Sequence, residues 1–249
     1  MSQKYYRKKL IAIPTVGKTV ALSPDSGESL SIETAILSNS SGGAADIGFG
    51  WKHPNGLWKA GQYDNATFYA DDTTDAQSAA TDDVLLSDGN ADGFVVQSIV
   101  PFNMVGFTIH TPGVGGSVAS PTIQYFNGTA WTTITPQKVP DFTVTADSDT
   151  YLVFLLPADW AKGGPAGQGI DAGKYAILVT FATGPTTDPK ASLIWVVTFL
   201  DFVEQLLDNG QLVMDTGGEL VIPHGASIVP YFSVANAQNM FEVTYRPSR

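Results

Sequence analysis

Residues 122–134 read TIQYFNGTAWTTI, and this stretch decides the fold of the chain. Two runs rich in β-branched and aromatic residues flank the pair Asn127-Gly128. Asn-Gly between two such runs is a strong hairpin signal, because both residues tolerate the positive φ that a type I′ turn requires. The stretch therefore predicts two antiparallel strands joined by a tight turn.

A further strand is predicted at residues 174–181, which read KYAILVTF. Successive side chains of a strand point to opposite faces. The odd-numbered side chains from Tyr175 to Phe181 therefore share one face, and the even-numbered ones from Ala176 to Thr180 share the other. This alternation is typical of a strand in the core of a β-sandwich.

Two apolar runs complete the predicted sandwich. Residues 151–156 read YLVFLL and predict a strand. Residues 193–200 read LIWVVTFL and are apolar on both faces, as expected of a strand buried on both sides, and they are too short to cross a bilayer. Trp131 and Trp160 are expected to fill the core, where inward aromatic side chains contribute most to stability.

Strands are also predicted on both flanks of this central region. In residues 29–36 the alternation is strict, and Leu30, Ile32, Thr34 and Ile36 are expected to face inward. Further strands are predicted at residues 44–51, 219–222, 227–232 and 241–245. No helical period of useful length is present, so the predicted fold class is all-β.

The predicted architecture is two β-sandwich (jelly-roll-like) modules, with the second inserted in the first. Residues 1–15 are assigned to an N-terminal arm, residues 16–93 and 201–249 to a discontinuous outer sandwich, and residues 94–200 to the inserted sandwich. Neither flank alone has enough strands to bury a core, which favours joining them. Two sequential domains divided near Gly93 are the alternative.

The composition limits the classes of function. The chain has 249 residues, of which 43% are hydrophobic and 15% charged, as in a packed globular protein. Its net charge of −11 argues against nucleic acid as a partner, because phosphate binding needs a basic face. The absence of cysteine excludes disulfides and thiolate metal sites. No apolar run predicts a signal peptide or a membrane span, so we expect synthesis in a cytoplasm and no membrane partner.

Catalytic motifs are absent from the sequence. It contains no nucleophile elbow, P-loop or dinucleotide fingerprint. The three histidines, His53, His110 and His224, lie in separate segments without the spacing of metal ligands. We therefore predict a protein that is not an enzyme, with no catalytic residues and no cofactor apart from the calcium hypothesis that follows.

One stretch resembles part of a calcium loop. Residues 88–93 read DGNADG, which places Asp88, Asn90 and Asp92 at alternating positions suited to converge on one ion. The twelfth position of the loop is Ile99, where an EF-hand needs a bidentate glutamate, so an EF-hand is excluded. A different calcium site, completed by Asp82 or Asp83, is one hypothesis. A polar loop before a strand is the other.

Two sets of residues are candidates for partner binding. The first is the basic N-terminal segment, with Lys4, Tyr5, Tyr6, Arg7, Lys8 and Lys9. It is either a solvated chain end or an arm that docks on an acidic neighbouring subunit.

The second set lies in and next to residues 52–93, which are weakly patterned and are predicted to form a long loop with a role in function or in an interface. Its aromatic side chains are Trp51, Trp58, Tyr63, Phe68 and Tyr69. They would either anchor a subunit interface or stack on sugar rings. A glycan-binding protein would keep Trp58 and Tyr63 exposed, whereas an assembly protein would bury them against its partners.

Several spaced motifs in residues 103–181 resemble a β-sandwich found in structural proteins of tailed bacteriophages. They are the aromatic-Asn-Gly-x-x-Trp hairpin at residues 126–131, the strand end Pro157-x-Asp159-Trp160 and the strand led by Gly173-x-Tyr175. Residues 37–42 (LSNSSG) and 221–228 (VIPHGASI) are similar to small sandwiches of phage head and neck components. The run Phe154-Leu155-Leu156 is more apolar than in the first family, which predicts extra burial at this point.

The resemblance implies a structural protein of the virion, made in the host cytoplasm. It would be a capsid decoration (cement) protein or the base of a head fibre. It would form homo-oligomers and contact the major capsid protein or other virion subunits. The alternative function is a carbohydrate-binding module of a phage tail or baseplate that binds host glycans.

Overall fold

The computed structural model describes residues 7–12, 22–26, 28–52, 56–64, 66–79, 83–89, 92–207, 209–222, 226–232, 236 and 238–248. The side chains of strand residues 46, 51, 52, 69, 199–206, 217–219, 231 and 248 are not part of this description. Within it the chain forms strands β1 to β16 and one helix, α1 (Thr73–Gln77). No helix there is long and apolar enough to cross a membrane. The predicted all-β fold class is confirmed.

The chain divides into two compact units, one with residues Met1–Pro54 and Val197–Arg249 and the other with Asn55–Val196. Residues 55–93 therefore belong to the second unit and not to the outer sandwich to which the sequence analysis assigned them. The reason is strand pairing, because β4 (Leu57–Asp64) is hydrogen-bonded to β7 (Gly93–Ser98) along most of its length.

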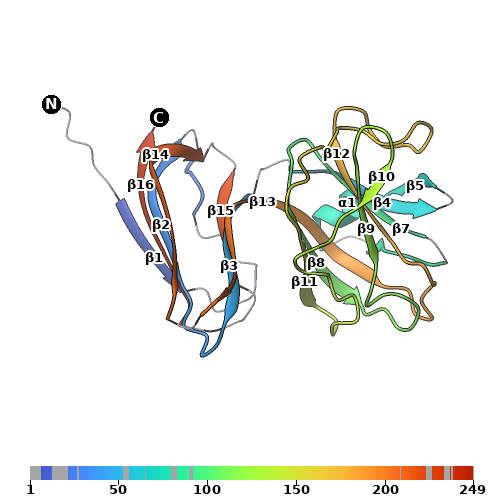
Figure 1. Ribbon diagram of the computed structural model, residues 1–249, viewed down its shortest axis with the longest axis horizontal. Coiled ribbons are helices and arrows are strands. Elements are labelled where there is room, and N and C mark those ends of the chain that lie inside the picture. The colour runs from blue at the N-terminus through green and yellow to red at the C-terminus, as the bar shows by residue number, and fades with distance from the viewer. Residues whose placement is uncertain are drawn as a thin grey trace. The chain divides into compact units, whose positions relative to one another are not determined.

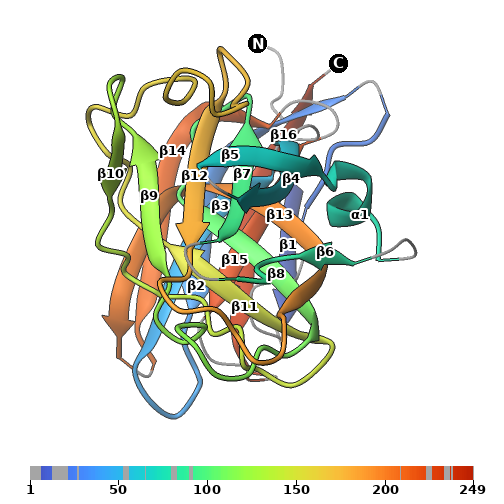
Figure 2. The same ribbon diagram turned by 90° about the vertical axis from the view of Figure 1, so that its right-hand side faces the viewer.

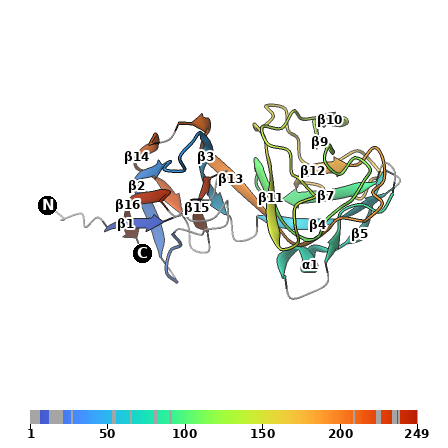
Figure 3. The ribbon, with the colours of Figure 1, turned by 90° about the horizontal axis from the view of Figure 1, so that it is seen from below.

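The first unit is a sandwich of two β-layers (Figure 1, Figure 3). One layer has the order β1 (Arg7–Ala12), β16 (Met240–Ser248), β2 (Ser29–Ser38) and β14 (Gln211–Ile222). The other contains β3 (Ala45–Lys52) between β15 (Ser227–Phe232) and the later part of β13 (Lys190–Leu206).

Side chains from both layers form the core of this unit, and they include Ile32, Leu37, Phe49, Ile228 and Phe241. The rings of Phe49 and Phe241 join the layers, with their centroids 6.1 Å apart.

The predicted inward face of β2 is correct in its first half only. Leu30 and Ile32 are buried in the core, as predicted, but further along Ala35 and Leu37 are the fully buried residues. Pairing with both β14 and β16 shifts register between Ile32 and Thr34. An irregularity of this kind moves every later side chain to the other face. The strict alternation of the sequence is thus interrupted in the structure.

The second unit is also a two-layered sandwich (Figure 2). The larger sheet has the strand order β10 (Trp131–Thr133), β9 (Thr122–Phe126), β12 (Tyr175–Thr180), β7, β4 and β5 (Thr67–Asp71). Facing it are β11 (Ser148–Val153), β8 (Met104–Thr111) and the first part of β13, with which β6 (Val84–Leu85) also pairs. Segments β4, β5, α1 and β6 replace the long loop predicted for residues 52–93.

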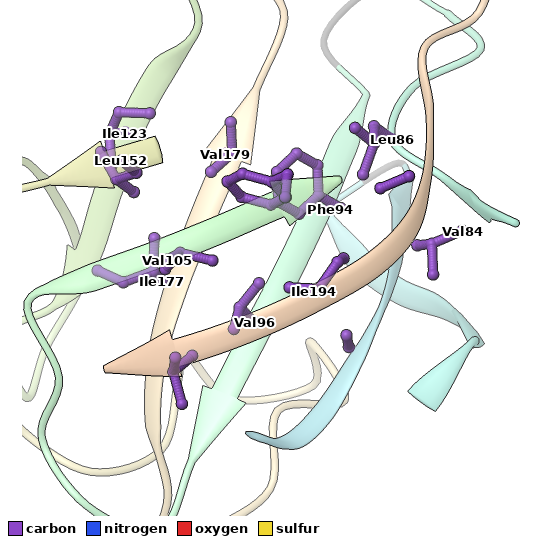
Figure 4. Close-up of a cluster of buried hydrophobic side chains, with 14 of the residues drawn as sticks. Val84, Leu86, Phe94, Val96, Val105, Ile123, Leu152, Ile177, Val179 and Ile194 are labelled. Atoms are coloured by element: carbon purple, nitrogen blue, oxygen red, sulfur yellow. The ribbon is translucent and has the colours of Figure 1, made fainter. Parts of the chain in front are cut away.

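The core of the second unit lies between these sheets. Figure 4 shows Phe94 and Val96 of β7 in one cluster with Val105 of β8 and Ile194 of β13. The predicted alternation of residues 175–181 is confirmed, because Ile177, Val179 and Phe181 join this core. Ala176 and Leu178 face away from it, in a smaller cluster on the outer side of the sheet.

Two details of the predicted core differ from the structure. Trp160 packs against the main core, but Trp131 packs against the outer cluster, because it lies on the other face of the sheet. Phe154 is fully buried, whereas Leu155 is 71% exposed and Leu156 is 44% exposed. The extra burial predicted before Pro157 is thus limited to one residue.

The hairpin at Asn127-Gly128 forms with a longer turn than predicted. Trp131 pairs with Phe126, which leaves residues 127–130 in the turn. Only Gly128 has a positive φ, of 96°. The Asn127 side chain stabilises the turn, because its Oδ1 accepts hydrogen bonds from the N–H groups of Thr129 and Ala130, each at 2.9 Å. Asn127 therefore acts as a hydrogen-bond acceptor and not as a type I′ residue.

Candidate functional site

The described part of the basic N-terminal segment is a strand of the first unit. Arg7, Lys8 and Lys9 lie in β1 and pair with Tyr245, Thr244 and Val243 of β16. Over residues 7–12 the predicted arm is therefore part of a sheet, while Lys4, Tyr5 and Tyr6 lie outside the described residues.

Strand β1 presents a mixed basic and apolar surface. Ile11 packs against the core, so the alternating positions Lys8 and Leu10 face away from it. The Lys8 Nζ lies 2.8 Å from the Glu242 Oε2, and the Leu10 side chain is 59% exposed. Among the described residues β1 pairs with β16 alone, so within this part of the chain it is an edge strand.

The structure separates the aromatic residues that the sequence grouped together. Trp58 is 45% exposed, whereas Tyr63 is only 5% exposed. The backbones of Trp51 and Tyr69 lie in β3 and β5, and their side chains are outside the description. Tyr63 is covered by its own chain, so it is available neither to a sugar nor to a partner subunit.

Tyr63 holds a glycine-rich loop, residues 161–174, on the outer face of the six-stranded sheet. The Tyr63 hydroxyl donates a hydrogen bond to the Gln168 Oε1 at 2.6 Å, and the Trp131 Nε1 donates to the same oxygen at 2.6 Å. Burial raises the pKa of Tyr63, and its contact with Trp131 partly offsets this effect. The Phe68 N–H also donates to the Gln168 backbone oxygen, at 2.8 Å. Gln168 thus fixes the middle of the loop.

Trp58 lies at an irregularity of β4 and is surrounded by charged groups. The pairing of β4 with β7 shifts register between Leu57 and Lys59, which leaves Trp58 as the extra residue. The Trp58 Nε1 donates a hydrogen bond to the Asp171 Oδ2 at 2.8 Å. The Lys174 Nζ lies 3.6 Å from the centroid of the indole ring. A β-bulge redirects side chains in this way and is often found next to functional sites.

Two further charges complete this group, which we call the Trp58 site (Trp58, Lys59, Asp71, Asp171 and Lys174). The Lys59 Nζ lies 3.5 Å from the Asp171 Oδ1 and 3.7 Å from the Asp71 Oδ2. Trp58 and Lys59 both reach Asp171, so the irregularity places two consecutive side chains on one face of the sheet.

Gln97 lies beneath this site and is fully buried. Its Oε1 accepts a hydrogen bond from the Asp171 N–H at 3.0 Å, so the backbone of Asp171 is anchored on β7. Among the described residues, the buried Gln97 Nε2 has no hydrogen-bond partner. Buried polar groups are nearly always paired, so an oxygen from water or a ligand is expected there.

The carboxylates that come together near the predicted calcium loop are only partly the ones that the sequence predicted to converge. Asp92 interacts with Asp88, as the hypothesis requires, and also with Asp64 at the end of β4. Burial and then these neighbours raise the pKa of Asp92 to about 6. Asp83 lies elsewhere, with its Oδ2 3.7 Å from the His110 Nε2.

Asn90 and Asp82 are outside the described residues. Within the described ranges, no group of three or more His, Cys, Asp or Glu side chains is arranged to hold a metal ion. The described carboxylates instead raise the pKa of Asp92, so that Asp92 keeps its proton up to a higher pH than an ordinary aspartate.

Sequence reasoning missed most of the Trp58 site. Asp171 and Lys174 lie in a glycine-rich loop 113 positions or more from Trp58, and Gln97 is part of an apolar strand. One signal was present, because a lone glutamine in the run FVVQS of β7 is unusual for a strand buried on both faces. Such a residue indicates a polar group nearby on one face.

Comparison of this chain with known protein families, with curated proteins and with solved structures finds no match in any of the three. Inferences about function therefore depend on the residues and geometry of the chain itself.

Proposed function

We propose that this protein is a structural component of a bacteriophage particle, and that it decorates the head by binding the major capsid protein. The sequence motifs of residues 103–181 support this proposal through their resemblance to phage sandwiches. The observation that carries it is strand β1, an edge strand with an exposed apolar side chain and three exposed basic ones.

The charge of β1 contrasts with that of the chain as a whole. The net charge is −11, yet four of the thirteen Lys and Arg residues lie at positions 4–9. A local basic segment on an acidic protein favours one orientation toward an acidic surface and repels the others. The proposed contact is therefore made by β1 and the residues that precede it.

The edge of β1 adds a second source of affinity. A strand at the end of a sheet is where another protein adds a strand through main-chain hydrogen bonds, and side chains such as Leu10 then provide specificity. Decoration in this proposal is mechanical, because surface buried across subunit junctions holds the shell together. Catalysis has no part in it.

The test is co-sedimentation of the purified protein with capsids that lack it. Deletion of the residues before Ile11 is unsuitable, because it removes four of the six residues of β1 and uncovers the edge of β16. We would compare the unmodified protein with Leu10→Asp and with the control Val114→Asp, since these side chains are similarly exposed at 59% and 54%. Circular dichroism would establish that all three proteins are folded.

Saturable binding that Leu10→Asp weakens by about tenfold or more, and Val114→Asp does not, is the expected result. Equal binding of all three proteins would contradict the proposed contact through β1, but it would not contradict binding to the capsid. Failure of the unmodified protein to bind would contradict the decoration function itself.

A further inference from the structure

We infer that the Trp58 site binds a neutral saccharide, with a sugar ring on the exposed indole surface and sugar hydroxyls on the surrounding charges. This inference goes beyond the proposed function, and it concerns the second unit, whereas β1 belongs to the first.

The first argument is the state of the Trp58 ring. One indole face is occupied by the Lys174 Nζ, and the N–H is bonded to Asp171. Trp58 is nevertheless 45% exposed, so the residue is not covered by these contacts. An aromatic face is electron-rich and attracts the weakly positive C–H groups on the face of a sugar ring. Aromatic surface beside a few fixed polar groups is the usual composition of a small-molecule site.

The second argument is the balance of charge. The site contains two ammonium groups, of Lys59 and Lys174, and two carboxylates, of Asp71 and Asp171. Carboxylates accept hydrogen bonds and ammonium groups donate them, whereas a hydroxyl does both. Neighbouring sugar hydroxyls therefore match this mixed set. An anionic ligand would require an excess of positive charge, which the site does not have.

The third argument is size. A stable protein interface buries about 800 Å² on each partner and has an apolar centre. The Trp58 site offers one partly exposed ring enclosed by charges, which is too little apolar surface for such a centre. A single sugar ring, in contrast, is similar in size to an indole. The geometry thus favours a saccharide over a protein.

The fourth argument is that the site is held in place before any ligand arrives. The Asp171 backbone is bonded to Gln97, its side chain is bonded to Trp58, and Gln168 fixes the loop that carries it. Ordering of side chains on binding lowers affinity, and a site that is already ordered avoids this loss. The Gln97 Nε2, which no described residue bonds, adds a donor that a water bridging to the ligand would satisfy.

The test is isothermal titration of the full chain with maltotriose, cellotriose and chitotriose as neutral probes and with a sialylated trisaccharide as the anionic probe. Trp58→Ala removes the indole ring on which the sugar is proposed to stack. Asp171→Asn removes one carboxylate charge. Leu155→Ala is the control, because this side chain is 71% exposed in the same unit and is not part of the site.

The expected result is saturable binding of at least one neutral probe, with a dissociation constant of about 1 mM or lower. Trp58→Ala should weaken this binding by about tenfold or more, and Leu155→Ala should leave it unchanged. No binding of any neutral probe at about 10 mM would overturn the inference. Equal binding by Trp58→Ala, or preference for the sialylated probe, would overturn it as well.

The two proposals fail separately. Leu10→Asp should bind the sugar normally, and Trp58→Ala should co-sediment with capsids normally. A variant that loses both sugar binding and co-sedimentation with capsids would be misfolded, which circular dichroism detects. In that case Trp58→Phe would decide the inference. This variant keeps an aromatic platform and should retain more sugar binding than Asp171→Asn if stacking is the main contribution.

Discussion

Substitution of Phe142 is the most direct test of the packing of the second unit. It is fully buried although it lies in an irregular segment between strands. Its ring makes edge-to-face contacts with Phe94, Phe107 and Phe181, at centroid distances of 5.9, 5.3 and 5.6 Å. We predict that Phe142→Ala strongly destabilises this unit.

The expected loss is about 4 kcal/mol of unfolding free energy. Truncation of a buried Phe to Ala costs about 3–5 kcal/mol, and the value depends on how far the surroundings collapse into the cavity. Collapse is restricted here, because the backbone is held on both sides of the ring. The Phe142 oxygen accepts the Gly113 N–H at 2.8 Å, and the Asp141 N–H donates to the Thr150 Oγ1 at 2.7 Å. The loss of three aromatic pairs places the estimate in the upper half of the range.

Urea denaturation followed by circular dichroism measures this change. Because each unit has its own core, native-state hydrogen exchange is needed to assign it, and the amides of β7 and β8 should lose protection while those of β2 and β3 keep it. The control Val139→Ala, at a side chain that is 42% exposed, should change stability by less than about 0.5 kcal/mol. A loss below about 1.5 kcal/mol for Phe142→Ala, or an equal loss of protection in both units, would refute the packing described above.

Two further predictions concern buried polar and acidic groups. Asn39 is fully buried and its Nδ2 donates to the Gly43 oxygen at 2.9 Å, so Asn39→Ala should destabilise the first unit by about 2 kcal/mol in urea denaturation; a change near zero would contradict the bond. Asp92 has a pKa of about 6 in the folded state, against about 4 in the unfolded state. Between these pH values the folded state binds more protons than the unfolded state. The free energy of unfolding should therefore fall as the pH rises from about 4 to 6. The shift corresponds to at most about 3 kcal/mol, and solvent screening of this partly exposed carboxyl reduces the effect to about 1 kcal/mol or less. Asp92→Asn should remove this part of the pH dependence, and an unchanged pH profile would show that Asp64 and Asp88 do not act on Asp92.

The strands themselves were predictable because their signals are local. Alternation in residues 175–181 identified both faces of β12 correctly, since a pleated chain places successive side chains on opposite sides whatever surrounds it. The same argument failed in β2 after Ile32. There the shift of register arises from pairing with two other strands, β14 and β16, and the residues of β2 itself do not predict it.

The Trp58 site was not predictable, because it is assembled from distant segments. Trp58 and Asp171 are 113 positions apart, and the entropy of closing a loop grows only slowly with its length, so spacing in the sequence carries little information about contact. Likewise, the burial of Tyr63 depends on a loop that pairs with it through Gln168. By itself the sequence determined the all-β class, most of the strands and one core face, through periodicity and composition. Only the tertiary structure decided the unit boundaries, the register of β2 and the surroundings of Trp58, because these depend on hydrogen bonds and contacts between segments that are remote in the chain.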